Sequence, residues 1–412
     1  KNFNFQNVVR PIPYQTFDEI CLDGGIILNF KADAHLIRVL GEQLIASERV
    51  GILELVKNSY DAGASYCKVR IEKVPSLVKL GPKEYNFNQY DGPVIIIEDD
   101  GSGMSRRDIE EGWLRPASII KTDIKERIKT EKAKAVSSGK LSTYNRFINT
   151  LKKEYNGRIP LGEKGVGRFA THKLGRKVII KTKVPENDYE YILEIDWDKF
   201  DMISDKPVDL DSIGVSLSRQ PVSRDYGKKR SGTQIIIYGG RNEYELEKEE
   251  IKEINRTLIK LNTPKPDPNA KIQAFEVIFE CPQVPDLAEK PFRDYFEPIF
   301  TITGIVDEFG KFNYDFLFNP PKSVPMTKEP RKNKIQDLRL ISEVKEYWQA
   351  PDIEKLIRKP VCGEFYIHLE VWYRSSPWIE GPFSTEFKEE LEEYGGISVY
   401  RDGINVFPAE WG

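Results

Sequence analysis

The sequence has few of the residues that characterise disulfide-rich or zinc-binding proteins. Its 412 residues include four cysteines and three histidines, which are far apart and form no C-x-x-C pair. This scarcity argues against a disulfide scaffold or a zinc site and favours a reducing, cytoplasmic compartment. No apolar run approaches the roughly 18 residues needed to cross a bilayer, and no leader opens the chain, so we expect no membrane association.

The sequence also has no excess of positive charge. Its 62 Lys and Arg residues against 65 Asp and Glu residues give a net charge of −3. A chain of this charge creates no overall basic field that would attract nucleic acid, so any such binding would have to be local. The sequence begins at Lys1 without a methionine and stops at Gly412 just after a hairpin pattern, and we therefore expect a fragment of a longer protein.

Composition divides the chain into three parts. Residues 1–30 are of mixed polarity and contain two prolines, which predicts an N-terminal arm. Residues 31–262 alternate helical and strand-like patterns, and the segment TPKPDPN at 263–269 then marks a domain boundary. Residues 270–412 combine strand-like stretches with two helical patterns. This organisation predicts an α+β fold in which a mixed sheet covered by helices is followed by a smaller α+β domain.

The first polar block lies on a helix that is expected to run from Ser47 to Tyr60. On such a helix Glu54, Asn58 and Asp61 fall within about 60° of one another, among mostly apolar neighbours. The stripe is either the solvated face of the helix or a carboxylate and an amide directed into a pocket. In a pocket, the carboxylate could orient or deprotonate water and the amide oxygen could ligate Mg²⁺ beside phosphates.

The second polar block, Glu98-Asp99-Asp100-Gly101-Ser102-Gly103-Met104, follows an apolar run of strand length. Its two glycines would let the backbone bend close to a flat ligand. Asp99 could accept a hydrogen bond from an exocyclic amine such as that of adenine. The alternative is an ordinary acidic turn, which is common in proteins.

The third block, Gly162-Glu-Lys-Gly165-Val-Gly167-Arg168-Phe169, places closely spaced glycines before a helical pattern. Free backbone N–H groups at the start of a helix suit phosphate oxygens. The block is not a Walker-type phosphate loop, because Arg168 follows Gly167 where lysine and then serine or threonine are required. A dinucleotide-binding fold is also a poor interpretation, because no strand precedes these glycines.

Taken in order, these blocks resemble the ATP-binding motifs of the GHKL superfamily. That superfamily groups DNA gyrase, heat-shock chaperones, histidine kinases and mismatch-repair ATPases on the Bergerat fold, an α/β sandwich. The sequence ELVKNSYDAGA resembles its Asn box, EDDGSGM its D-x-G-x-G box and GEKGVGRFA its second glycine box, and Gly232-Thr233 resembles the strand that closes the adenine site. The resemblance covers roughly residues 30–240.

The resemblance implies a role for several residues. Glu54 would be the general base and Asn58 the Mg²⁺ ligand, while Asp99 would contact the adenine amine with support from the Thr233 hydroxyl. Gly101, Gly103 and Met104 would shape the base pocket. The other nucleotide contacts that it implies are Asp61, Ala62, Gly162, Lys164, Gly165, Val166, Gly167, Arg168 and Phe169.

The resemblance also implies a lid and a second domain. The lid would comprise residues from about 115 to 161. Within it, residues 121–134 hold six basic and three acidic side chains and predict a mobile polar insertion, whose basic run we interpret as a solvated helix face rather than a nucleic-acid patch. Residues 270–412 would be a transducer-like domain that is incomplete at its C-terminus. Its ATP-contacting lysine would lie beyond Gly412, and the weaker candidates within the chain are Lys322, Lys328 and Lys332.

The function implied by the resemblance is that of a slow, Mg²⁺-dependent ATPase that acts as a conformational switch. ATP would close the lid and bring two copies together, and the output would act on a macromolecule or a C-terminal effector. Glu54, four residues before Asn58, favours the hydrolysing branch, whereas His35 lacks the acidic neighbour of a phosphoacceptor histidine. The alternatives are a chaperone-like ATPase, a histidine-kinase-like phosphotransferase and a non-catalytic ATP sensor. A prokaryotic defence system is one possible setting, although no residue identifies it.

Overall fold

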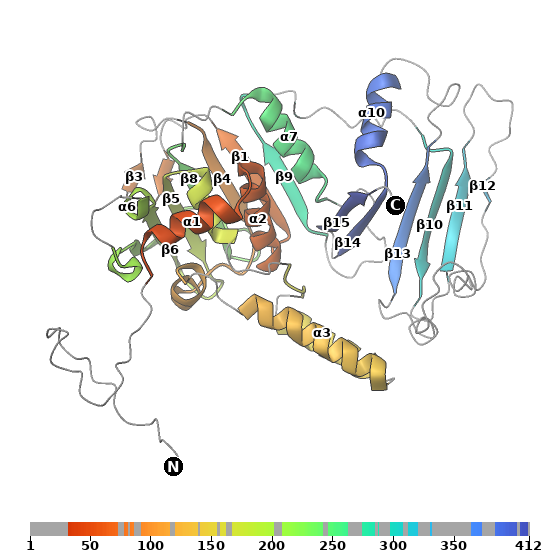
Figure 1. Ribbon diagram of the computed structural model, residues 1–412, viewed down its shortest axis with the longest axis horizontal. Helices are drawn as coiled ribbons and strands as arrows, with labels where there is room; N and C mark the ends of the chain where they lie inside the picture. The colour runs from red at the N-terminus through yellow and green to blue at the C-terminus, as the bar shows by residue number, and fades with distance from the viewer. Residues whose placement is uncertain are drawn as a thin grey trace, which may run out of the picture.

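The described part of the computed structural model contains two bodies of sheet structure, the larger of which carries most of the helices (Figure 1). The model describes residues 32–72, 78–80, 83–85, 92–115, 120–138, 141–154, 157–161, 167–201, 208–241, 246–262, 274–284, 287, 297–307, 312–319, 330–331, 364–372, 384–401 and 404–410. The predicted N-terminal arm lies outside these residues. Among the helices within them, none is both long and apolar enough to cross a membrane.

A mixed sheet of seven strands forms the centre of the larger body. Its strand order is β7-β6-β5-β8-β4-β1-β9, and every neighbouring pair is antiparallel except β1 and β9, which run parallel. The strands are β1 (Tyr66–Glu72), β4 (Val94–Asp99), β5 (Lys177–Lys183), β6 (Tyr189–Asp196), β7 (Ser216–Pro221), β8 (Gly232–Tyr238) and β9 (Glu276–Glu280). This sheet with its helices is the mixed α+β arrangement that the sequence predicts and is consistent with a Bergerat fold.

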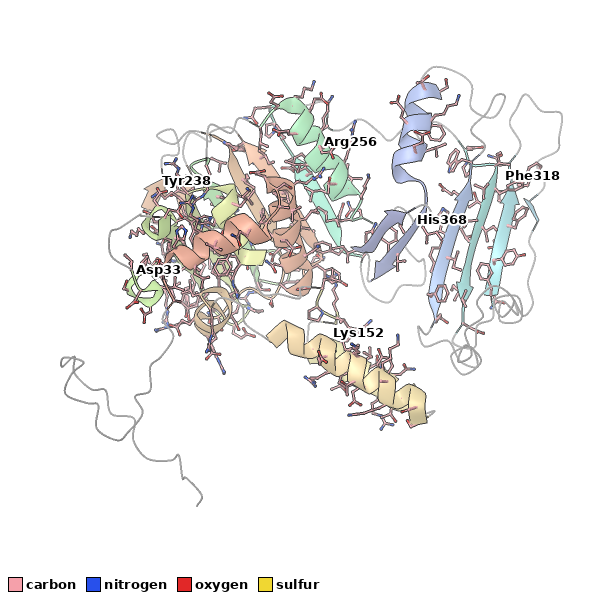
Figure 2. The ribbon with its side chains drawn as sticks, in the orientation of Figure 1. Asp33, Lys152, Tyr238, Arg256, Phe318 and His368 are labelled. Atoms are coloured by element: carbon pink, nitrogen blue, oxygen red, sulfur yellow. The ribbon has the colours of Figure 1, made fainter. Side chains whose placement is uncertain are left out.

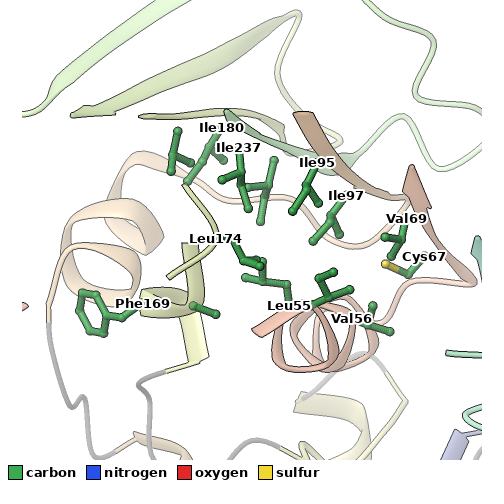
Figure 3. Close-up of a cluster of buried hydrophobic side chains, with 14 of the residues drawn as sticks. Leu55, Val56, Cys67, Val69, Ile95, Ile97, Phe169, Leu174, Ile180 and Ile237 are labelled. Carbon is green, nitrogen blue, oxygen red and sulfur yellow. The ribbon is translucent and has the colours of Figure 1, made fainter. Parts of the chain in front are cut away.

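Four helices accompany this sheet, and α1 and α2 cover one of its faces (Figure 1). They are α1 (His35–Leu44), α2 (Glu48–Asp61), α5 (Ala170–Leu174) and α7 (Lys248–Ile259). Helix α2 begins as the sequence predicts, because the Ser47 hydroxyl accepts a hydrogen bond from the Val50 N–H. Its residues Leu55 and Val56 are buried against the apolar side chains of β1 and β4 (Figure 3).

The burial of the strands explains why they form a central sheet. In β1 the buried residues Cys67, Val69 and Ile71 alternate with partly exposed ones, as expected for a strand with one covered face. Most residues of β5 and β8 are buried on both faces. Their second face contributes Ile179 and Ile236 to a smaller apolar cluster, so the strands that carry the site are held on both sides.

The segment predicted to be a mobile polar insertion forms two helices. Helix α3 (Ile120–Ser138) packs against α4 (Leu141–Glu154). Figure 1 shows α3 projecting from the larger body. Residues 121–134 lie within α3, and their mobility stays a prediction. Ile124, Ala135 and Leu151 are 2%, 5% and 1% exposed, respectively. We refer to α3 and α4 together as the helical hairpin.

The smaller body is a four-stranded antiparallel sheet with the order β12-β11-β10-β13. Helix α10 accompanies it, and the ring of its buried residue Phe387 lies 5.0 Å from that of Trp372. The remaining elements are β10 (Phe300–Val306), β11 (Phe312–Phe318), β12 (Pro330–Arg331), β13 (Phe365–Val371), α10 (Ser384–Tyr394), β14 (Ile397–Arg401), β15 (Ile404–Glu410), β2 (Val78–Leu80), β3 (Lys83–Tyr85), α6 (Asp198–Asp201), η3 (Asp108–Trp113), η4 (Gly167–Phe169) and η5 (Leu210–Ser212).

Two elements beyond residue 270 belong structurally with the larger body. Strand β9 pairs with β1, although it follows the proline-rich segment at which composition predicts a boundary. The β14–β15 hairpin attaches to the end of α7, where the Asn405 N–H donates to the Leu261 carbonyl over 2.9 Å and Ile404 joins the main core. A proline-rich loop can connect elements within one body, so composition alone does not locate the edge of the sheet.

Candidate functional site

A buried carboxylate ends the central strand β4. Asp99 is 6% exposed, and its Oδ1 accepts hydrogen bonds from the N–H groups of Gly101 (2.9 Å) and Thr233 (3.2 Å). Its Oδ2 accepts one from the Ser59 hydroxyl over 2.9 Å. Burial raises the pKa of Asp99, and these hydrogen bonds together with the Arg224 charge oppose that rise. A carboxylate has about four acceptor positions, two on each oxygen. Among the residues that the structure describes, Ser59 occupies one position on Oδ2, which leaves a second position for a donor on a ligand.

Two glycines allow the backbone after Asp99 to pass very close to its neighbours. Gly103 has a φ of +68°, and a Cβ placed there would lie 1.9 Å from the Lys183 carbonyl oxygen. A Cβ on Gly101 would lie 2.8 Å from the Ala62 Cβ and 3.0 Å from Asp99 Oδ1. The turn therefore has a shape that only glycine permits at these positions.

We expect Gly103→Ala to destabilise the fold by roughly 2–5 kcal/mol. The alanine backbone would be held in the left-handed region, and its methyl group would clash with the Lys183 carbonyl oxygen. Urea unfolding followed by circular dichroism measures this free energy. Gly112→Ala is the matched control, since a Cβ there meets nothing within 4 Å. Equal unfolding midpoints for the two variants would contradict the prediction.

Strand register places two threonines beside the carboxylate. Thr233 of β8 lies directly opposite Asp99 of β4 on one side and Thr182 of β5 on the other. The two threonine hydroxyls are 3.0 Å apart, and Thr182 Oγ1 also accepts a hydrogen bond from the Met104 N–H over 2.8 Å. This row of polar groups fixes the turn that carries Gly103 against the strands.

The end of the third block, where η4 begins, packs against the polar stripe of α2. A Cβ on Gly167 would lie 3.1 Å from Glu54 Oε2 and 3.8 Å from Asn58 Nδ2. Glu54 Oε1 accepts a hydrogen bond from Lys57 Nζ over 2.9 Å, and the Glu54 side chain is 31% exposed. A carboxylate, an amide and the start of a glycine-led turn thus meet at one place on the surface of the fold.

Two predicted contact residues hold protein segments together in the structure. Asp61 Oδ1 accepts a hydrogen bond from the Leu161 N–H over 2.7 Å, immediately before the third block. The Ala62 carbonyl accepts one from the Ser102 N–H over 2.9 Å. The end of α2 therefore connects the segment before the third block with the acidic turn.

The last two residues of the third block point elsewhere. Arg168 donates to the backbone carbonyls of Gly112 and Arg115, at the end of η3, and burial lowers its pKa to about 10. Phe169 is 4% exposed and packs edge-on against Trp197 in the main core. Arg168 thus holds the segment before the helical hairpin and Phe169 is a core residue, while their contact with a nucleotide stays a prediction.

Several predicted contacts lie outside the described residues. They are Gly162, Lys164, Gly165 and Val166 of the third block, and the candidate transducer lysines Lys322, Lys328 and Lys332.

Sequence reasoning missed three polar residues that support the Asp99 carboxylate. Ser59 and Thr182 contribute hydroxyls to it or to its neighbours, and Arg224 donates to the Asp99 carbonyl over 3.1 Å while its NH1 lies 2.9 Å from Glu98 Oε2. Ser59 directly follows Asn58, so its position in the helix could have indicated it. Thr182 and Arg224 carry no local signal, because strand pairing and loop folding bring them to the site.

A cavity of about 720 Å³ lies beside this site rather than at its centre. Trp113, Arg168 and Trp197 line it, whereas Asp99 and Thr233 do not. Within the described part of the chain, no group of three or more His, Cys, Asp or Glu side chains is placed to hold a metal ion. A divalent ion at Asn58 would thus rely on ligand phosphates and water, which is the usual way in which proteins bind Mg²⁺.

A family model matches part of the chain. Residues 46–233 match the family described as histidine kinase-, DNA gyrase B-, and HSP90-like ATPases. This segment contains α2, the acidic turn, the third block and the first two residues of β8. No individual curated protein matches the chain.

Proposed function

We propose, from the premise that residues 46–233 belong to the histidine kinase-, DNA gyrase B- and HSP90-like ATPases, that this chain binds Mg²⁺ and ATP and hydrolyses the terminal phosphate. One observation carries the proposal. The polar stripe of α2 faces Gly167 near the end of the third block, and the same helix supplies Ser59 to the buried Asp99 carboxylate. One helix thus links a candidate phosphate end of the site to a candidate adenine end.

The adenine end relies on a single acceptor. Asp99 Oδ2 receives the Ser59 hydroxyl and has a further acceptor position, which suits the exocyclic amine of adenine. Thr233 donates its N–H to Oδ1 and its hydroxyl is paired with that of Thr182. These contacts hold the carboxylate in one orientation, so recognition of the base requires little rearrangement of the protein.

The phosphate end relies on Glu54, Asn58 and the backbone around Gly167. Backbone N–H groups at the start of a helical turn, as at Gly167 of η4, suit phosphate oxygens. Glu54 Oε2 lies on the side of the carboxylate that Lys57 does not occupy, so it can accept a proton from an attacking water. Mg²⁺, held through the Asn58 amide oxygen, would neutralise phosphate charge.

ATP hydrolysis in this domain would be coupled to a conformational change. We infer that ATP binding repositions the helical hairpin as a lid and promotes association of two copies. Arg168 supports this inference, because it follows Gly167 directly and is bonded to Arg115, five residues before the hairpin begins. A change in the third block would therefore reach the hairpin through one side chain.

Phosphate release and light scattering test the proposed function together. The purified chain should release phosphate from ATP with Mg²⁺ present and lose this activity when EDTA is added. Its scattering mass should double with Mg²⁺ and a non-hydrolysable ATP analogue. A stable phosphoprotein formed from labelled ATP would instead indicate a phosphotransferase, and unchanged mass at saturating analogue would contradict ATP-dependent association.

A further inference from the structure

The helical hairpin concentrates positive charge in a protein that is acidic overall. Residues 120–154 contain ten Lys and Arg residues against four Asp and Glu residues, a net charge of +6. The whole chain has a net charge of −3, so the rest of it carries −9. A charge difference of this size between a projecting element and the body it leaves creates a local field that the whole-chain balance conceals.

The way in which the two helices pack turns this charge toward solvent. Ile124, Ala135 and Leu151 are buried, and α3, which packs against α4, projects from the larger body (Figure 1). Figure 2 shows side chains with polar ends along this projecting part, with Lys152 labelled. The exposed basic side chains that the structure describes here are Arg127, Lys129, Lys132, Lys134, Arg146 and Lys153.

Most of these exposed basic side chains have no ion pair among the residues that the structure describes. Lys134 pairs with Glu131 over 2.8 Å. Among the described residues, Lys129, Lys132, Arg146 and Lys153 have no ion pair. Lys129 and Lys132 are three residues apart on α3, and Arg146 and Lys153 are seven apart on α4, so each pair lies on one face of its helix.

The side chains and the shape of the hairpin favour one class of polyanionic ligand over the others. A lipid surface would require an apolar face that is open to lipid, but the large apolar side chains that the structure describes in the hairpin are buried or half-buried. Single-stranded nucleic acid binds on exposed aromatic rings, whereas the hairpin has only Tyr144 and Phe147, both partly buried, and Arg127 lies over the Phe147 ring. Helix α3, about 28 Å long and carrying exposed lysines, fits the wide major groove of B-form DNA and the phosphates along it. The major groove of duplex RNA is too narrow for a helix.

We propose that the helical hairpin is a binding surface for the phosphate backbone of double-stranded DNA. Lys129, Lys132, Arg146 and Lys153 make the contacts, and binding is independent of sequence because phosphates carry no base information. The surface is a local exception to the acidic balance of the chain. This inference does not depend on ATP hydrolysis, since the charges stand on the hairpin whether or not nucleotide binds.

Fluorescence anisotropy with a labelled 30-base-pair DNA of mixed sequence tests the proposal on the full chain without nucleotide. Affinity should fall steeply as salt is raised, because binding releases counterions. A variant carrying Lys129→Glu, Lys132→Glu and Lys153→Glu should bind at least tenfold more weakly. The corresponding alanine variant should reduce the slope of log affinity against log salt by about 2–3, near 0.9 for each lost phosphate contact.

The matched control reverses three exposed basic side chains elsewhere on the larger body, Arg176→Glu, Lys199→Glu and Lys228→Glu. These changes lower the net charge similarly and should leave affinity within about twofold. Equal losses in the two variants would overturn the proposal, because they would reflect overall charge alone. Tighter binding to a single strand or to duplex RNA of the same length would also overturn it, as would binding to phosphatidylserine vesicles with no retention of DNA. Circular dichroism melting of each variant establishes that it is folded.

Discussion

Replacing Glu54 with alanine should preserve ATP binding and reduce phosphate release by roughly a hundredfold or more. Positioned general bases contribute about 10²–10⁴ to rate, and the loss here would fall on turnover rather than affinity. Glu54 lies on α2 and faces Gly167 of η4. Its side chain is 31% exposed, so it is not required to fill the core. Isothermal titration with ATP and a phosphate-release assay separate the two effects. If the associated state depends on uncleaved ATP, this variant should accumulate it.

Glu54→Gln sharpens the test of the base. It keeps the shape that packs beside Gly167 and removes the ability to take up a proton, so its rate should resemble that of the alanine variant. Glu253→Ala, which removes an exposed carboxylate on α7, should hydrolyse ATP at the wild-type rate. Normal phosphate release by Glu54→Gln would exclude Glu54 as the base and would assign it a packing role.

Replacing Asp99 with asparagine should weaken ATP binding by roughly ten- to a hundredfold while leaving the fold intact. The asparagine oxygen can still accept the N–H groups of Gly101 and Thr233, and its amide can donate to the Ser59 hydroxyl. The acceptor for the adenine amine is then replaced by a donor, which leaves two donors facing each other. Loss of one buried hydrogen bond of this kind costs about 1–3 kcal/mol.

Asp100→Asn is the matched control, because it changes the neighbouring carboxylate without touching the base site. Burial would raise the pKa of Asp100, yet hydrogen bonds from Ser65 and the charge of Lys229 outweigh this effect and lower it. Asp100→Asn should therefore cost stability near neutral pH and leave ATP affinity nearly unchanged. An unaltered dissociation constant for Asp99→Asn, measured by titration calorimetry, would refute its adenine role.

Local patterns in the sequence predicted much of the fold. The Ser47 cap and the apolar face of α2 follow from helical periodicity, and the alternation of β1 follows from a strand with one buried face. The acidic turn was predictable because its glycines follow an apolar strand directly. Such features depend on residues close together in sequence, so no knowledge of distant partners is needed to find them.

The helical hairpin shows the limit of local reasoning. Its density of charge indicates a solvated polar insertion when it is judged by composition. Ile124 on α3 and Leu151 on α4 are nevertheless buried. The burial of such scattered apolar residues depends on long-range packing, which composition does not reveal.

The elements that form and the side chains that can carry chemistry follow from local patterns: a carboxylate and an amide on α2, an aspartate at the end of β4 and glycines before α5. Which of these groups meet follows from the folding of distant segments onto one another. The strand order β5-β8-β4 sets Thr182, Thr233 and Asp99 in one row, and the packing of η4 against α2 sets Gly167 beside Glu54. Periodicity and capping act over a few residues, whereas strand register and helix packing are fixed by burial across the whole chain.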